Sequence, residues 1–178
     1  METLFAKQDR LLLLTSTEII RTLMHRINWD AQLVAIRGPR GVGKTTLMLQ
    51  YMKLHYEVYS REVLYCTLDS VYFSNHTLLE LADVFVKNGG KHLFLDEVHK
   101  YPTWSKEIKE VYDMYPDLKV VFSASSLLNI LNADADLSRR CIPYEMQGLS
   151  FREFLLFYKQ MSFPVCTLEE VLTSPEKI

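Results

Sequence analysis

Residues 38–45 read Gly-Pro-Arg-Gly-Val-Gly-Lys-Thr and combine glycines with one lysine and one hydroxyl side chain at fixed spacing. They fit the pattern G-x-x-x-x-G-K-[ST], the phosphate-binding P-loop. The glycines let the backbone curl so that successive N–H groups point at an anion. Lys44 can then reach the β- and γ-phosphates of ATP, and Thr45 offers a hydroxyl to Mg²⁺. The predicted phosphate-binding residues are Gly38, Pro39, Arg40, Gly41, Val42, Gly43, Lys44, Thr45 and Thr46.

The flanking residues match what this loop requires. Residues 32–37 are typical of a short buried strand that runs into the loop, and residues 45–52 are typical of the helix that leaves it. The positive N-terminal end of that helix would add to the same phosphate cradle. A chance glycine-rich turn is the alternative, but all four fixed positions are filled between a strand and a helix. The sequence therefore predicts a nucleotide-binding site.

The second motif is acidic. The apolar stretch 92–95 is followed by Asp96 and Glu97, and Asp96 lies 52 residues after Lys44. This is the Walker B pattern, in which the aspartate holds Mg²⁺, usually through its waters, and the glutamate orients the attacking water. Two adjacent carboxylates could also form a solvated turn. With a P-loop upstream, we interpret Thr45 and Asp96 as the metal-binding pair and Glu97 as the residue that activates water. The glutamate favours hydrolysis of ATP over binding alone.

Four polar residues further along the chain are weaker candidates. Ser123 and Ser125 follow the next predicted strand, where a hydroxyl could sense the γ-phosphate or position water. A serine-rich turn that caps a helix explains them equally well. Arg139 and Arg140 could act as an arginine finger in a neighbouring subunit, but an ordinary solvated pair is the better interpretation.

Other residues near these motifs are best explained by structure. Asp69 is more simply a turn residue at a strand end than a substrate contact. His99 and Lys100 follow the acidic pair and are interpreted first as surface residues, although a partner could contact them. Trp104 is interpreted as a packing residue.

The order of predicted elements indicates an α/β fold. Strands that alternate with helices form a parallel sheet with helices on both faces, and ligands bind at the carboxyl ends of the strands. We expect a helix over residues 15–28, where a capping-box spacing precedes an apolar stripe, and a last strand over 141–145 at an edge because of Pro143. The remaining predicted elements are strands 62–67 and 119–122 and helices 77–88, 104–115, 127–131 and 150–158, the last with Phe154, Leu155 and Tyr158 on its inner side.

Bulk properties exclude several classes of protein. The chain has 178 residues, a net charge of −2 and 48% hydrophobic residues, which gives no global attraction to nucleic acid or to an anionic membrane. The longest aliphatic run, residues 11–14, is too short to span a bilayer, and no secretory signal is visible. Cys66, Cys141 and Cys166 are scattered and are interpreted as buried thiols in a reducing compartment. We expect a cytoplasmic protein.

Several segments together resemble the predicted AAA+-superfamily ATPases of bacteria and archaea. The resemblance rests on residues 38–46 (GPRGVGKTT), 64–69 (LYCTLD), 93–104 (LFLDEVHKYPTW), 123–128 (SASSLL) and 149–155 (LSFREFL), and it covers about residues 15 to 158. One departure is that the family commonly has Gly-Ser-Ser where this chain has Ser-Ala-Ser at 123–125, which leaves the sensor assignment open between Ser123 and Ser125.

The resemblance implies a three-layer P-loop NTPase fold with a parallel five-stranded sheet in the order 5-1-4-3-2. It also implies a separate C-terminal domain after the ATPase core, so we expect the chain, which stops at Ile178, to be a fragment. The expected organisation is an N-terminal helical segment over 1–30, an ATPase core over 31–148 and the start of a C-terminal helical region over 149–178.

We therefore predict an ATP-binding protein and Mg²⁺-dependent ATPase, weak in this fragment, that couples ATP binding and hydrolysis to its C-terminal domain or to a protein partner. One alternative is a helicase, since residues 96–99 fit D-E-x-H. Against it, the short spacing between the two motifs leaves little room for motifs that contact nucleic acid. A second alternative is a binding module whose shape changes with ATP and whose turnover is incidental. A small-molecule kinase fits less well because no lid segment is visible. The oligomeric state and the partner stay open.

Overall fold

The computed structural model describes residues 1–124, 137, 139–164 and 166–173. The chain divides into two compact units, Met1–Gln147 (unit 1) and Gly148–Ile178 (unit 2). The elements of unit 1 are α1 (Glu2–Leu14), η1 (Thr22–His25, a 3-10 helix), β1 (Leu33–Arg37), α2 (Lys44–His55), β2 (Val63–Thr67), η2 (Val71–Ser74), α3 (Leu78–Lys87), β3 (His92–Asp96), η3 (Val98–Lys100), α4 (Trp104–Met114), β4 (Lys119–Ala124) and β5 (Ile142–Glu145).

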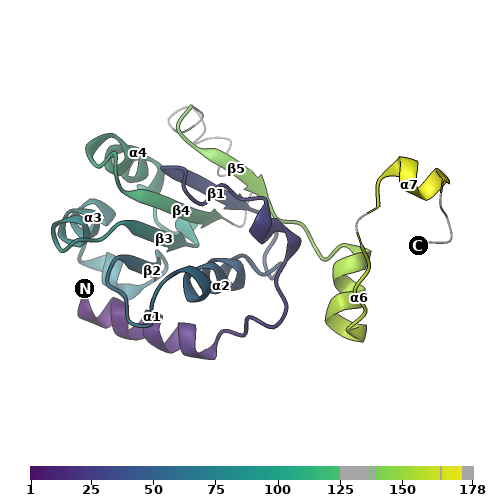
Figure 1. Cartoon of the computed structure of the whole chain (residues 1–178). Coiled ribbons are helices and arrows are strands. Elements are labelled where there is room, and N and C mark those ends of the chain that lie inside the picture. The colour runs from purple at the N-terminus through teal and green to yellow at the C-terminus, as the bar shows by residue number, and fades with distance from the viewer. Residues whose placement is uncertain (125–136, 138, 165, 174–178) are drawn as a thin grey trace. The chain divides into compact units, whose positions relative to one another are not determined.

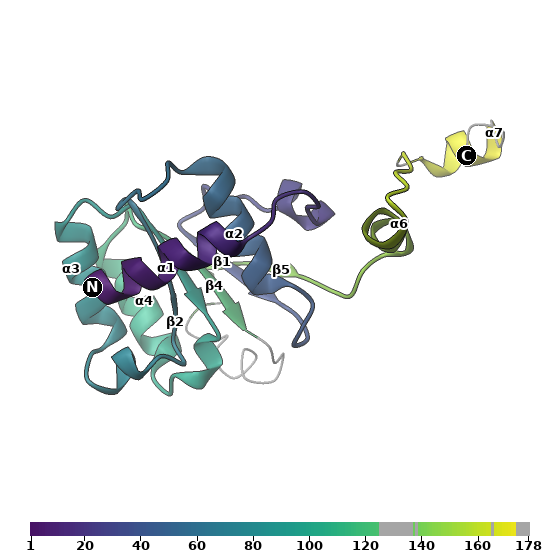
Figure 2. The ribbon, with the colours of Figure 1, turned by 90° about the horizontal axis from the view of Figure 1, so that it is seen from below.

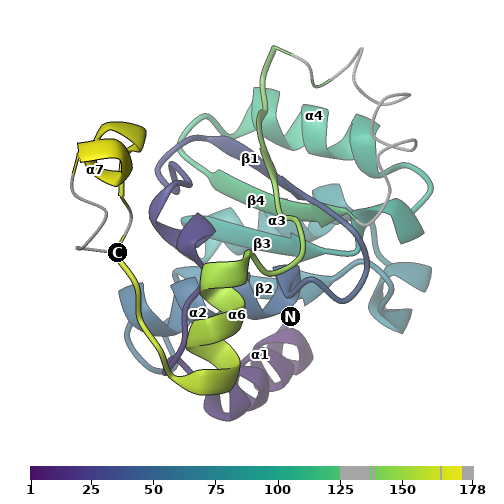
Figure 3. The ribbon, with the colours of Figure 1, turned by 90° about the vertical axis from the view of Figure 1, so that its right-hand side faces the viewer.

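The five strands of unit 1 form one parallel sheet with the order β2-β3-β4-β1-β5. Figure 3 shows β1, β4, β3 and β2 following one another across the unit. Read from the other edge, this is the predicted order 5-1-4-3-2, so the predicted fold class is confirmed. Pro143 lies opposite Ala35 in the edge strand β5, where a residue without an N–H is tolerated.

Alternate residues of the strands face two separate hydrophobic cores. One core joins Leu93 and Leu95 of β3 to buried residues of α3 and α4. The other joins Phe94 of β3 to α2 and to Met24 of η1. Because β1, β2, β3 and β4 are buried on both faces, they have the nearly continuous apolar sequences typical of parallel sheets. The helices therefore cover both faces of the sheet (Figure 1).

Helix α1 lies along β2, the edge of the sheet opposite β5 (Figure 2). Its Gln8 is buried, accepts a hydrogen bond from the backbone N–H of Tyr65 at 2.6 Å and donates to the carbonyl of Val63 at 3.3 Å. One side chain thus satisfies two backbone groups that a neighbouring strand would otherwise bond. An uncovered edge strand is a template for association with other chains, and α1 covers this one.

The predicted helix over residues 15–28 is wrong. Residues 15–21 are not helical, and only η1 forms within the predicted range. The carbonyls of this segment are bonded by α2 instead: Gln50 donates to Ser16 and Ile19, and Lys53 donates to Thr15. Met24 and Ile27 of the apolar stripe are buried in the core that contains α2, whereas Ile19, Ile20 and Leu23 are half-buried, so helical spacing alone misassigned the segment.

In unit 2, α6 (Phe151–Lys159) is followed by α7 (Leu168–Thr173). The capping box that predicted the start of α6 is present, with Ser150 and Glu153 each bonding the other's backbone N–H. The predicted inner side is wrong, since Phe154 is 42% exposed and Tyr158 is 68% exposed.

The remaining predictions have mixed outcomes. Cys66 is buried, whereas Cys141 and Cys166 are only half-buried, which corrects the prediction of three buried thiols. The predicted helix over residues 127–131 lies outside the described residues. Within the part of the chain that the structure describes, no helix is long and apolar enough to cross a membrane.

Candidate functional site

The P-loop connects β1 to α2 and depends on glycine at two positions. Gly38 has φ of 153°, and a Cβ there would lie 2.0 Å from the carbonyl oxygen of Met146. Gly43 has φ of 100° and is the N-cap of α2. Both φ angles favour glycine, and the contact at Gly38 also excludes any larger residue. The loop therefore delivers Lys44 as the first residue of α2.

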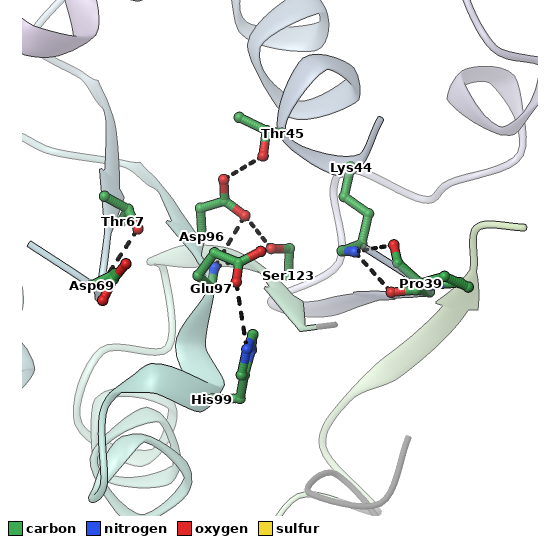
Figure 4. A network of polar contacts seen from close by, with 10 residues as sticks. Pro39, Lys44, Thr45, Thr67, Asp69, Asp96, Glu97, His99 and Ser123 are labelled. Atoms are coloured by element: carbon green, nitrogen blue, oxygen red, sulfur yellow. Dashed lines mark hydrogen bonds and ion pairs between the residues drawn. The ribbon is translucent and has the colours of Figure 1, made fainter. Parts of the chain in front are cut away.

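Lys44 is 5% exposed, and its ammonium group lies over its own loop. Nζ donates to the carbonyls of Gly38 and Pro39, both at 2.8 Å (Figure 4). Burial lowers the pKa of Lys44, and the nearby carboxylates of Glu97 and Asp96 oppose that shift. The lysine is held where a phosphate carried by the loop amides would meet it.

Asp96 ends β3 and is 3% exposed. Its Oδ2 accepts hydrogen bonds from the hydroxyl of Thr45 at 2.6 Å and from the hydroxyl of Tyr65 at 2.8 Å. Its Oδ1 accepts from the hydroxyl of Ser123 and from the backbone N–H of Glu97 at 3.0 Å. Figure 4 shows Thr45, Asp96 and Ser123 meeting at one point. The structure therefore brings together the two residues that the sequence predicted to bind metal.

Sequence reasoning missed Tyr65 at this site. Tyr65 lies on β2, and burial raises the pKa of its phenol, as does the charge of Asp96. The phenol consequently stays protonated and donates to the carboxylate. The available signal was a single hydroxyl-bearing aromatic in a mostly apolar strand, two positions before the strand's end.

Glu97 follows directly and has a left-handed backbone, with φ of 53° and ψ of 39°. For a residue with a Cβ this conformation is unfavourable by roughly 1–2 kcal/mol, and such residues concentrate at functional sites. The hydroxyl of Ser123 accepts the backbone N–H of Glu97 at 3.2 Å. The carboxylate of Glu97 lies 3.4 Å from Nε2 of His99 (Figure 4). Ser123 is fully buried, and its hydroxyl bonds both the carboxylate of Asp96 and the backbone of Glu97, so it helps to fix both acidic residues.

The other predicted site residues differ in exposure and in their contacts. Arg40 and Thr46 are exposed, and so is Asp69, whose backbone N–H donates to the hydroxyl of Thr67 at 3.4 Å in a turn after β2. Arg140 forms a two-pronged ion pair with Asp113 of α4. The other candidates that the structure describes are Gly41, Lys100 and Arg139, which are exposed, Val42, which is half-buried, and Trp104, which is buried beside Phe122. Ser125 lies outside the described residues.

The parallel sheet, the glycine loop that opens α2 and the threonine–aspartate pair define the class of P-loop nucleoside triphosphatases. Within this class, a family model described as AAA domain matches residues 30–155. Since the match covers well over half of the chain, the protein belongs to the AAA domain family of P-loop ATPases.

Two curated relatives are uncharacterized proteins of Methanocaldococcus jannaschii. One is 26% identical over 155 residues, which cover 83% of this chain and 32% of the relative. The other is 28% identical over 131 residues, which cover 71% of this chain and 29% of the relative. The chain thus spans about a third of the length of these relatives. A Walker-type ATPase of Pyrococcus abyssi shares the fold, with a TM-score of 0.52, 12% identity, and coverage of 86% of this chain and 56% of that chain.

Proposed function

We propose that the protein is an Mg²⁺-dependent ATPase whose turnover depends on Glu97. The observation that carries the proposal is the 2.6 Å hydrogen bond between Thr45 of the P-loop and Asp96 of β3. These two oxygens come from separate motifs, and both motifs end at the same edge of the sheet. Their convergence beside Glu97 favours hydrolysis over binding alone.

The P-loop would bind the phosphates of ATP. The positive φ angles of Gly38, Gly41 and Gly43 shape a loop whose N–H groups can surround an anion. Lys44 would exchange the carbonyls of Gly38 and Pro39, which it now bonds, for phosphate oxygens. The exchange requires a side-chain movement only, because the ammonium already lies over the loop.

Mg²⁺ fits the donors at the end of β3. The hydroxyl of Thr45 and the carboxylate of Asp96 are hard oxygen ligands of the kind that Mg²⁺ prefers. When bound, the ion would neutralise charge on the β- and γ-phosphates. Tyr65 and Ser123 would orient the carboxylate of Asp96, since each donates to one of its oxygens.

Glu97 would orient and polarise the attacking water. Its backbone is fixed by Asp96 and Ser123 while its carboxylate extends toward His99. Glu97 would leave its contact with His99 before it orients a water, so we expect slow basal turnover. We further propose that ATP binding and hydrolysis are coupled to a conformational change in unit 2 or in a protein partner.

Steady-state ATP hydrolysis with Mg²⁺ tests the proposal. Glu97→Gln should keep ATP binding and lose about 10²–10⁴-fold in turnover, the usual contribution of a positioned general base. Lys44→Ala, the control for binding, should abolish binding of a fluorescent ATP analogue. Parental turnover in Glu97→Gln would show that another group activates water. Strong stimulation by single-stranded or duplex DNA would instead favour the helicase alternative.

A further inference from the structure

The P-loop is attached to the two residues that end unit 1, Met146 and Gln147. The carbonyl of Met146 is so close to Gly38 that no Cβ fits between them, and its methyl group lies 3.5 Å from the Cβ position of Gly43. Met146 is itself 1% exposed. Because the two segments pack this closely, a change in the loop would displace Met146 as well.

Arg21 adds a polar connection between the same two segments. Its Nη1 donates to the carbonyl of Val42 in the P-loop at 2.8 Å, and its Nη2 donates to the carbonyl of Gln147 at 2.9 Å. Arg21 precedes η1 and lies outside the range that the family model matches. The planar guanidinium holds its donors in a rigid fork, which suits two carbonyls from different segments. A lysine would supply a point charge without that fixed geometry.

Unit 2 begins at Gly148, the residue after Gln147. We propose that Arg21 is a positioning residue that fastens the P-loop to the chain leading into unit 2, so that nucleotide in the loop alters the backbone at Gln147. The inference rests on the proposed function, because nucleotide must bind the loop for the connection to act. When Lys44 turns to the phosphates, its hydrogen bonds to the carbonyls of Gly38 and Pro39 would break. This changes the loop at Gly38, the residue that Met146 contacts.

Hydrogen exchange of the whole chain, with and without Mg²⁺ and a slowly hydrolysed ATP analogue, tests this. In the parent protein, nucleotide should slow exchange both in a peptide covering residues 37–47 and in one covering 145–150. In Arg21→Ala, the first peptide should still be protected, while the nucleotide-dependent protection of the second should fall at least about tenfold, as expected for loss of a charged hydrogen bond. Arg21→Lys should lose part of it. Arg26→Ala, an exposed arginine in the same segment, is the matched control and should behave as the parent.

Three outcomes would overturn the proposal. Unchanged protection of residues 145–150 in Arg21→Ala shows that Arg21 does not connect the two segments. If Arg21→Ala fails to fold, parental behaviour of Arg21→Lys at residues 145–150 has the same meaning. If nucleotide fails to protect residues 37–47 in the parent protein, ATP binding itself is absent, and the proposed function fails with the connection. Protection of both peptides in the parent together with loss at only one in the variant distinguishes this inference from the proposed function.

Discussion

The two ends of β3 each bury one ionisable side chain on the same face of the sheet, in different surroundings. At the carboxyl end, Asp96 accepts hydrogen bonds from three hydroxyl groups and one backbone N–H. At the amino end, His92 is 1% exposed and contacts the rings of Phe94 and Tyr51, and its Nδ1 is hydrogen-bonded to the hydroxyl of Tyr56 at 2.7 Å. Among the described residues, Nε2 of His92 has no hydrogen-bond partner.

The difference separates a site built to hold charge from one that excludes it. The converging donors satisfy both carboxyl oxygens of Asp96 in a buried position, at the point where we propose that a cation binds. Burial, together with the positive charge of Lys119 nearby, lowers the pKa of His92 to about 3, and the charge of Asp30 opposes this shift. Histidine therefore stays neutral and contributes to packing. Changes at the carboxyl end should affect chemistry, and changes at the amino end should affect stability.

The largest expected effect is that of Asp96→Asn. Mg²⁺-dependent turnover should fall by roughly 100-fold or more, since the metal's contribution is worth several kcal/mol. Stability should change by less than about 1 kcal/mol, because the amide nitrogen can replace Oδ2 and donate to the hydroxyls of Thr45 and Tyr65, while the amide oxygen replaces Oδ1 and still accepts from Ser123 and the N–H of Glu97. Hydrolysis at varied Mg²⁺ and urea unfolding measure the two quantities. A loss of stability above about 3 kcal/mol with turnover intact would place Asp96 with the structural residues.

The fold was largely predictable from the sequence because its strands are short apolar runs separated by strong helix and turn signals. The capping boxes at Thr77 and Ser150 each correctly marked a helix start. The spacing at residues 15–18 failed, because side chains of α2 bond the carbonyls that a helix would use. The spacing of residues within a segment cannot show that side chains from a distant helix will bond its backbone carbonyls.

Helices α3 and α6 show a further limit. Both begin with a complete capping box, yet Leu81 and Phe85 of α3 are 1% exposed while Phe151 of α6 is 75% exposed. Capping is a local interaction that the sequence displays directly. Burial of the apolar face depends on what packs against it, which helical spacing does not specify.

The candidate site was predicted as far as its motifs extend. Thr45, Asp96 and Glu97 were assigned from fixed spacing, and the structure places them together. Tyr65 was missed because it meets Asp96 only through the pairing of β2 with β3, and Arg21 was missed because it reaches the P-loop only through a contact with the carbonyl of Val42. Residues that act on a motif from elsewhere in the chain become visible only in three dimensions.

An intermediate effect is expected from acid at the amino end of β3. Above pH 6.5, His92 is neutral in both the folded and the unfolded chain. Below it, only the unfolded chain binds the proton, because the folded pKa is about 3. The free energy of unfolding should therefore fall by about 1.4 kcal/mol per pH unit, on the order of 3 kcal/mol between pH 6.5 and pH 4. Urea unfolding across this range measures the loss.

The variant His92→Phe isolates this contribution from those of other titrating groups. Phenylalanine preserves an aromatic ring beside Phe94 and Tyr51 but binds no proton. The pH dependence of its free energy of unfolding should be less steep than that of the parent, because about one proton fewer is bound on unfolding. The variant also leaves the hydroxyl of Tyr56 without the ring nitrogen, at a cost of about 1 kcal/mol. Equal slopes in the two proteins would mean that His92 is protonated in the folded state.

The smallest effect is expected from removing one tyrosine hydroxyl at each end of β3, which tests whether the two ends act independently. Tyr65→Phe deletes one of the donors to Asp96 and should raise the Mg²⁺ concentration for half-maximal turnover about tenfold, the lower end for loss of a group that orients a metal ligand. Tyr56→Phe deletes the partner of His92 and should leave that concentration unchanged while lowering stability by about 1 kcal/mol. If both variants shifted the Mg²⁺ dependence equally, the effect would be transmitted through the whole sheet, and the two ends of β3 would not be independent.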